Sequence, residues 1–210
     1  IGYYLWNKHI NEETKDVKGK KLTLLQSLIL VLLISLGVFV YKIVLDWLGG
    51  TGTLLDTARM KRAVSERFGV DARSVYGYNL GEHGNSQFTA WSQVRVKGQP
   101  ISTFTDEATL EEIAHEAMVG GHTVFYGKKY TSYGIASAAI RLAIAVVSDS
   151  HEELPVSNYY EPLDTYLSYP AIVGRDGIVE QIKLTLPADE EAKLENSANF
   201  IKRKFAESLN

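Results

Sequence analysis

The segment GTGTLLDTARM (residues 50–60), together with GYNLGEHGNSQFTAWSQVRVKGQPI (residues 77–101), decides what kind of domain this chain forms. The first segment predicts the beginning of a helix over Thr53–Phe68, because a threonine is available to cap it. The second segment predicts two strands, Ser74–Leu80 and Thr89–Val96, separated by a glycine-flanked loop. The two segments therefore predict a helix followed by a pair of strands, with charged side chains in both parts.

Two more helices are predicted further along the chain. Leu110–Val119 is a short acidic helix, and Gly120 and Gly121 are expected to end it. The next helix begins at Thr131 or Ser132, either of which can cap it. Its apolar positions follow the helical period, and they are Ile135, Ala136, Ala139, Ile140, Ala143, Ile144 and Val147.

The C-terminal part predicts a hairpin followed by a helix. Ala171–Val173 and Ile178–Val179 flank the turn-forming tetrad GRDG, and Gln181–Leu186 alternates polar and apolar residues as a half-buried strand does. A last helix starts after Pro187, where three acidic residues suit the positive end of a helix dipole. The predicted buried face of this helix is Leu194, Ala198, Ile201 and Phe205.

The N-terminal region differs from the rest of the chain in composition. Residues 1–21 form a polar tail that contains five lysines, whereas residues 22–41 carry no charge. A helix over that uncharged stretch would cover roughly 30 Å, the thickness of the hydrocarbon layer of a bilayer. We expect residues 22–48 to form a hydrophobic, membrane-anchoring helix with membrane contact through residues 22–41. The alternative is a buried core helix that has lost its covering.

The composition excludes several classes of protein. The 210 residues carry a net charge of −3, which argues against a generic nucleic-acid binder. The cysteine count of 0 excludes disulfide scaffolds, thiolate zinc sites and thiol nucleophiles. The histidines show no metal-ligand spacing. A hydrophobic content of 45% fits one folded domain with an appendage.

Asp56, Arg59 and His83 carry the chemistry that the sequence offers. Taken singly, Asp56 and Arg59 suit a surface ion pair, and His83 suits an ordinary loop histidine. Taken together, the three residues suit one catalytic site. A carboxylate beside an imidazole stabilises the imidazolium and fixes its tautomer, and a guanidinium holds a carboxylate with two parallel hydrogen bonds. This set suits proton transfer at the oxygen of a carboxylate-anchored substrate while a cofactor carries a hydride.

Four stretches of residues 50–210 resemble the C-terminal, substrate-binding half of the lactate/malate dehydrogenase family. They are the two segments above, KKYTSYGIASAAIRLA (128–143) and TYLSYPAIVGRDGI (165–178). The resemblance is strongest to the L-2-hydroxyisocaproate and L-lactate dehydrogenase branches, and DxxR followed by GEHG is a highly specific pair of motifs. It implies an α+β fold with helices on an antiparallel sheet and NAD as the cofactor. It also implies a small 2-oxo or 2-hydroxy acid substrate (branched, or lactate and pyruvate), a homo-oligomer and a cytoplasmic location.

The resemblance also implies a role for each matching residue. His83 resembles the catalytic proton donor and acceptor of the family, and Asp56 resembles its carboxylate partner. Arg59 resembles the anchor of the substrate carboxylate. Thr131 resembles the active-site threonine near the substrate and the nicotinamide, a role that is compatible with helix capping.

The N-terminal half of the family, a Rossmann domain, has no recognisable counterpart in residues 1–48, which lack the glycine-rich fingerprint. We therefore expect little or no dehydrogenase activity from this chain alone. The alternative interpretation is a non-catalytic, membrane-anchored relative, truncated or chimaeric, with an unrelated segment joined near Gly49. We do not expect the sugar-bisphosphate regulation of some family members, because Lys61 and Tyr76 stand at the corresponding positions.

Overall fold

The computed structural model describes residues 50–209, except for the side chains of residues 121, 122 and 125. The polar tail expected over residues 1–21 and the hydrophobic helix expected over residues 22–48 lie outside the described residues. Within residues 50–209, no helix combines the length and the apolar character that a membrane crossing requires.

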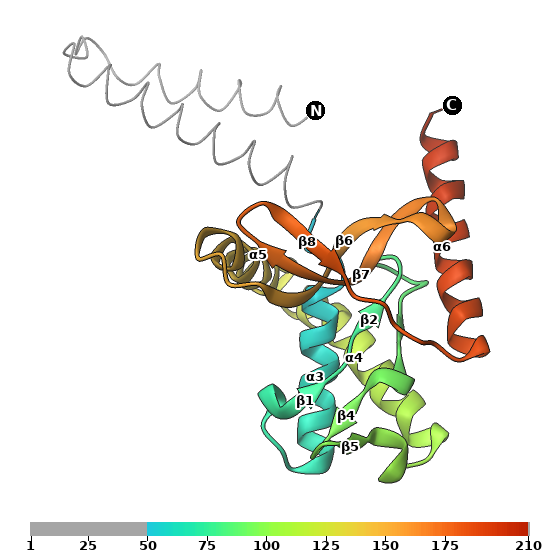
Figure 1. Ribbon diagram of the computed structural model, residues 1–210. Helices are drawn as coiled ribbons and strands as arrows, with labels where there is room; N and C mark the ends of the chain where they lie inside the picture. Colours follow the sequence, from blue (N-terminus) through green and yellow to red (C-terminus); the bar gives the residue numbers. More distant parts are fainter. Residues whose placement is uncertain (1–49, 210) are drawn as a thin grey trace, which may run out of the picture. The chain divides into compact units, whose positions relative to one another are not determined.

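A three-stranded antiparallel sheet forms the upper layer of the domain in Figure 1. Its strands are β6 (Glu152–Tyr160), β7 (Thr165–Gly174) and β8 (Gly177–Gln181), in the order β6-β7-β8. Helix α5 (Ser132–Val147) and the start of helix α3 (Leu54–Phe68) pack on this sheet. The buried core between these elements includes Leu54, Ala138, Leu142, Leu154, Val156 and Val173.

Helices α3 and α4 (Glu107–Lys128) pack against each other in the lower part of the domain (Figure 1). Short antiparallel strands cover them: β1 (Val75–Tyr76), β4 (Arg95–Val96) and β5 (Gln99–Pro100), in the order β1-β4-β5. The second core lies here and includes Met60, Val64, Val75, Val96, Ile101 and Ile113.

Helix α6 (Ala188–Ser208) packs on β7, near the end of the sheet opposite α5 (Figure 1). The third core joins α6 to β7 and to the antiparallel pair β2 (Asn79–Leu80) and β3 (Phe88–Thr89). Its buried residues include Leu80, Leu167, Tyr169, Leu194 and Ala198. Single turns of 3₁₀-helix connect the elements at Ala72–Ser74, Trp91–Gln93, Ile101–Thr103 and Glu161–Leu163.

The structure confirms the α+β fold for the described residues, where every strand pairing is antiparallel. The predicted helices α3, α5 and α6 form with nearly the predicted limits. The predicted hairpin turn joins β7 to β8. Strand β6, which pairs with β7 along its whole length, was not predicted.

The limits of four predicted elements were wrong, because tertiary packing or backbone geometry overrode the local signals. Helix α4 continues through Gly120 and Gly121 to Lys128, since a glycine inside a helix costs only about 1 kcal/mol and the first half of the helix is anchored in the second core. The strand expected over Ser74–Leu80 is divided into β1 and β2, which belong to different sheets, because Gly77 between them adopts φ = +132°. The strand expected over Thr89–Val96 is interrupted by a 3₁₀ turn. The strand expected over Gln181–Leu186 does not form, since Gln181 is the last residue of β8 and the next described element is α6.

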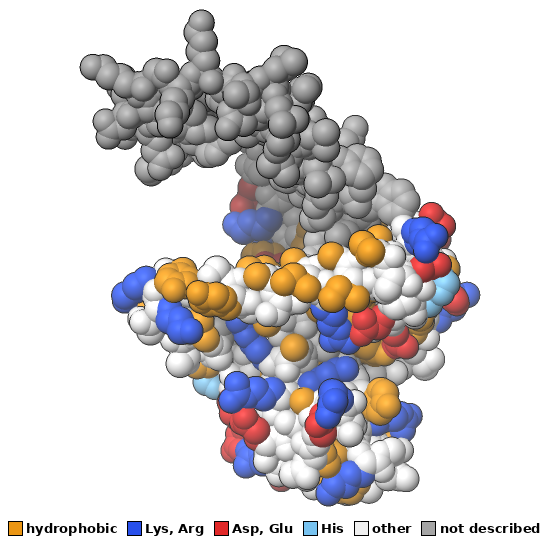
Figure 2. All heavy atoms as spheres, turned by 90° about the vertical axis from the view of Figure 1, so that its left-hand side faces the viewer, with side chains coloured by type: hydrophobic (Ala, Val, Ile, Leu, Met, Phe, Trp, Pro, Cys, Tyr) orange, Lys and Arg blue, Asp and Glu red, His pale blue; other side chains and the backbone are white. Residues whose placement is uncertain are grey.

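The faces of two helices also differ from expectation. Phe205 on α6 is 66% exposed rather than buried, because the buried residues of this helix all lie between Glu190 and Ala198, in its first half. Helix α5 buries its opposite side, whereas Ile140, which is 59% exposed, Ile144 and Val147 lie at the surface. Figure 2 shows hydrophobic side chains in a row across this side of the molecule.

Candidate active site

Asp56 lies near the start of α3, where a buried hydrogen-bond network fixes the helix. The hydroxyl of Thr53 donates to the carbonyl oxygen of Asn79 and lies 2.7 Å from the hydroxyl oxygen of Ser168. One turn later, the Thr57 hydroxyl oxygen accepts the Asn79 N–H at 2.9 Å. The N–H and the carbonyl oxygen of Asn79 in β2 are therefore both hydrogen-bonded to hydroxyl groups at the start of α3. The network sets the distance between Asp56 and the chain that leaves β2.

His83 follows β2 on a loop and reaches Asp56. Its Nδ1 lies 2.6 Å from Oδ2 of Asp56. The side chain of Asp56 is 6% exposed, whereas that of His83 is 51% exposed. An ionised carboxylate can only accept hydrogen bonds, so Nδ1 carries the proton and Nε2 is the nitrogen that is left to exchange one. This geometry gives the expected carboxylate–imidazole pair.

The pair changes the acidity of the imidazole. The hydrogen bond to Asp56 raises the pKa of His83 above its ordinary value, and the negative charge of Asp56 adds to this effect. Partial burial and the positive charge of Arg59 oppose the rise without cancelling it. His83 therefore holds its proton at a higher pH than an isolated histidine does.

Arg59 lies one turn beyond Asp56 on α3. Its Nη1 donates to Oδ1 of Asp56 at 3.1 Å, so the carboxylate binds the imidazole with one oxygen and the guanidinium with the other. The side chain of Arg59 is 24% exposed. A guanidinium has five N–H donors, and within the described part of the chain only the contact to Asp56 uses one. The remaining donors of Arg59 are available to an anion.

All four residues that the sequence singled out, Asp56, Arg59, His83 and Thr131, line one hollow of about 390 Å³. Thr131 reaches it from the beginning of α5, where its side chain makes no capping hydrogen bond. Thr131 is the N-cap residue, one of the two that the sequence allowed, but its side chain does not cap the helix, so its hydroxyl remains available to the hollow. The other lining residues are Leu55, Gly84, Asn85, Gln87, Met118 and Ile135.

These other lining residues were missed by sequence reasoning. Asn85 and Gln87 stand in the same sequence motif as His83. Their closeness to His83 in the sequence is the one signal that could have identified them. Oε1 of Gln87 is buried and has no hydrogen-bond partner among the described residues. Leu55, Met118 and Ile135 give the hollow an apolar wall. The site therefore combines a charged end with an aliphatic side.

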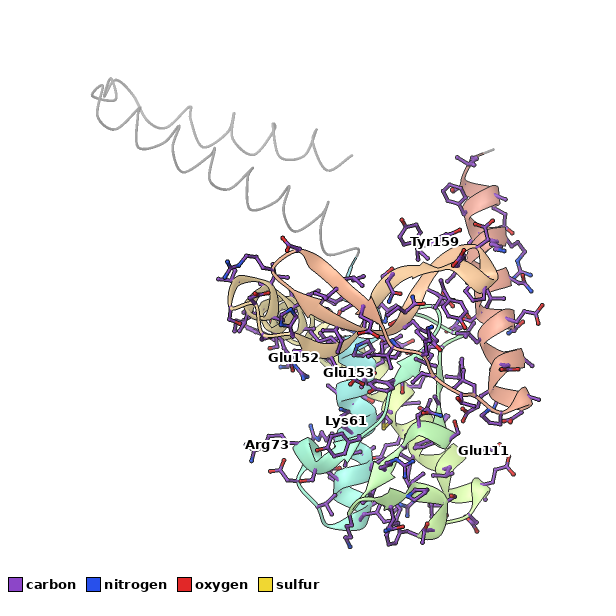
Figure 3. All side chains as sticks on the ribbon, in the orientation of Figure 1. Lys61, Arg73, Glu111, Glu152, Glu153 and Tyr159 are labelled. Atoms are coloured by element: carbon purple, nitrogen blue, oxygen red, sulfur yellow. The ribbon has the colours of Figure 1, made fainter. Side chains whose placement is uncertain are left out.

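Lys61 is the first of the two positions that correspond to the sugar-bisphosphate site. Its side chain points from α3 toward the side where Glu152 and Glu153 of β6 lie (Figure 3). The pKa of Lys61 is lowered, first by burial and then by the positive charge of Arg141, while the two glutamates oppose the shift. Tyr76, the second position, is exposed and carries a phenol in place of a basic side chain. A half-buried lysine that faces two acids is poorly suited to bind a phosphate anion.

The dinucleotide cofactor implied by the resemblance can be tested against the described residues. A pyrophosphate site of the Rossmann type needs a parallel strand that leads through a glycine-rich turn into a helix N-terminus. Residues 50–209 pair their strands only in the antiparallel sense. These residues therefore do not form such a site by themselves.

Comparison with known proteins agrees with this architecture. The family model for the lactate/malate dehydrogenase alpha/beta C-terminal domain matches residues 53–210. L-lactate dehydrogenase 2 of Clostridium acetobutylicum is 39% identical over 163 residues, which cover 73% of this chain and 51% of that protein. L-lactate dehydrogenase 1 of Lactobacillus acidophilus is 39% identical over 162 residues, or 73% of this chain and 50% of that protein.

Solved structures give the same result. A lactate dehydrogenase from a Medee basin deep-sea metagenome library superimposes with a TM-score of 0.70 and 33% identity, covering 73% of this chain and 52% of that chain. The minor L-lactate dehydrogenase of Enterococcus mundtii, in its ligand-bound form, gives the same four values. The chain thus spans about half the length of the curated relatives and solved structures that it matches.

Proposed function

Because the chain belongs to the lactate/malate dehydrogenase family, we propose that residues 50–210 are the substrate-binding half of an NAD-dependent L-2-hydroxy acid dehydrogenase. The observation that carries this proposal is the shared carboxylate of Asp56, which binds His83 through one oxygen and Arg59 through the other. The relatives named above are L-lactate dehydrogenases, and their names support the same reaction class.

In the proposed reaction, Arg59 binds the carboxylate of a 2-oxo acid through its unused N–H donors. Two parallel hydrogen bonds would fix the orientation of the substrate as well as add affinity. The carbonyl oxygen then lies toward Nε2 of His83, and the aliphatic part of the substrate lies along Leu55, Met118 and Ile135. This apolar wall suits a branched 2-oxo acid as well as pyruvate.

His83 is the proposed acid and base. In the direction of reduction, the protonated imidazole gives its Nε2 proton to the carbonyl oxygen, and the ionised Asp56 stabilises the cation until the proton leaves. In the direction of oxidation, neutral Nε2 accepts the proton of the hydroxyl group. The raised pKa of His83 favours the protonated form that reduction requires. Thr131 is proposed to donate or accept a hydrogen bond beside the substrate.

The family uses NAD as the carrier of the hydride. Since residues 50–209 do not form a dinucleotide site, we propose that the dinucleotide-binding half of the family fold packs beside the hollow. The exposed apolar side of α5 supports this arrangement, because Ile135 belongs both to that side and to the lining of the hollow. We expect the 210-residue chain alone to show little or no oxidation of NADH with 2-oxo acids.

The test is a titration of the full chain with pyruvate and with 4-methyl-2-oxopentanoate, followed by NMR of the imidazole of His83. We expect both acids to shift its signals. Replacement of Arg59 with lysine should weaken binding about tenfold or more, because the bidentate contact is lost. The control is Arg62→Lys, an exposed arginine on the same helix that pairs with Glu66. Equal effects of the two substitutions, or no response of His83 to either acid, would contradict the proposal.

A further inference from the structure

The loop that carries His83 is held by a residue far away in the sequence. We define the His83 loop as residues 81–87, which connect β2 to β3. Ser197 on α6 is fully buried, and its Oγ accepts the N–H of Glu82 at 2.7 Å. The same Oγ lies 3.0 Å from Oγ of Ser86. One hydroxyl group therefore contacts both sides of the loop around His83.

The directions of these hydrogen bonds follow from the groups involved. The carboxylate of Glu82 accepts from both the N–H and the hydroxyl group of Ser86. Since an ionised carboxylate offers no proton, the Ser86 hydroxyl must donate to it. The Ser197 hydroxyl must then donate to Oγ of Ser86. The result is a closed ring in which every polar hydrogen among Glu82, Ser86 and Ser197 has a defined acceptor.

The backbone beside the ring is shaped to fit α6. Gly81 adopts φ = +91°, and a Cβ atom built on it would lie 2.4 Å from Oγ and 2.9 Å from Cβ of Ser197. On its other side, Gly81 exchanges two backbone hydrogen bonds with Ser168 of β7, at 3.0 and 2.8 Å. The beginning of the loop is therefore clamped between the sheet and α6.

This clamp matters because the imidazole itself is half exposed. Within residues 50–209, the imidazole makes its one side-chain hydrogen bond to Asp56, and a distance of 2.6 Å between Nδ1 and Oδ2 leaves little tolerance for movement of the backbone. We propose that Ser197 is a positioning residue for His83, which holds the loop so that Nδ1 stays on Asp56. This inference rests on the proposed function for its catalytic meaning, but its structural content can be tested separately.

The experiment measures the pKa of His83 by NMR titration of the full chain, with the His83 signal assigned by its loss in His83→Gln. Three variants are compared with the unsubstituted chain: Ser197→Ala, Asp56→Asn and the exposed neighbour Asn196→Ala. We expect Asp56→Asn to lower the pKa of His83 most, since it removes the opposite charge. Ser197→Ala should lower it by about half a unit, as the loop relaxes away from Asp56. Asn196→Ala should leave it unchanged.

The outcomes separate the two claims. If Asp56→Asn leaves the pKa of His83 unchanged, the proposed acid–base pair fails. If Asp56→Asn lowers this pKa while folded Ser197→Ala does not, only the positioning role of Ser197 is overturned. Ser197→Thr, which keeps the hydroxyl group, should restore most of the lost shift where the extra methyl group is accommodated. Should Ser197→Ala fail to fold, Ser86→Ala decides, because it opens the same ring from the loop side; no change of the pKa there would overturn the proposal.

Discussion

The His83 loop and helix α5 line the same hollow, yet they are held in different ways. The loop is fixed by Ser168 on one side and Ser197 on the other, through hydrogen bonds that lie mostly inside the protein. Helix α5 contributes Ile135, and its N-cap residue Thr131 lines the hollow beside it. Ile135 belongs to the exposed apolar side of the helix, and Figure 2 shows a row of hydrophobic side chains on this side of the molecule. The hydrogen-bonded set of Asp56, Arg59 and His83 thus forms entirely within residues 50–209, whereas the opposite wall of the hollow belongs to an exposed apolar surface.

The largest expected change in the free energy of unfolding distinguishes the buried side of α5 from its exposed side. Leu142→Ala removes a fully buried side chain that packs under the sheet, and should lower the free energy of unfolding by about 3 kcal/mol. Ile140→Ala removes an exposed side chain from the same helix and should change it by about 0.5 kcal/mol or less. Urea unfolding of both variants measures the difference. Similar losses would mean that the exposed side of α5 is covered within the chain.

A second change in the free energy of unfolding tests whether Gly81 is held tightly between β7 and α6. Gly81→Ala combines a positive φ with a close overlap on Ser197, so we expect a loss of about 3 kcal/mol. Gly98→Ala is the matched control. Its φ of +78° is similar, but a Cβ there would meet nothing within 4 Å, and the backbone strain alone costs about 1 kcal/mol. If both substitutions cost the same in urea unfolding, α6 does not press on the loop as described.

The same contrast explains how far the sequence could predict the site. Asp56 and Arg59 are three residues apart on one helix, and His83 lies in a specific motif, so local spacing and resemblance were sufficient to select them. Ser197 could not be selected in this way. The helical period places Ser197 on the predicted buried face of α6, three residues after Leu194, but it does not reveal the partner, because Glu82 is 115 residues away.

The fold was predictable to a similar extent. Elements with a strong period and clear ends, such as α3 and α6, were found from their sequences. Helix α4 was cut short because the glycine pair looked like an end, although packing of Ile113 and Ala117 on α3 sustains the helix beyond it. Strand β6 begins with two glutamates and contains a proline, so its pairing with β7 depends on a partner that the local sequence does not reveal.

The smallest expected effect concerns pH and the charge of His83. Because the hydrogen bond to Asp56 raises the pKa of His83 in the folded state, the folded protein holds this proton more tightly than the unfolded chain, whose histidine pKa is about 6.5. The resulting stability is fully present below about pH 6.5 and is lost as the pH rises through the folded-state pKa. Since half of the side chain is exposed, water screens the pair, and we expect no more than about 1 kcal/mol.

The measurement compares urea unfolding of the unsubstituted chain and His83→Gln at pH 5.5 and pH 9. The stability lost on substitution should be larger at the lower pH and should shrink at the higher one. His115→Gln is the control, because His115 is exposed on α4 and has no ion-pair partner among the described residues. A loss for His83→Gln that is the same at both pH values would show that the Asp56 contact does not favour the protonated imidazole. The loop would then be held only by its hydrogen bonds to Ser168 and Ser197 and not by the charge of Asp56.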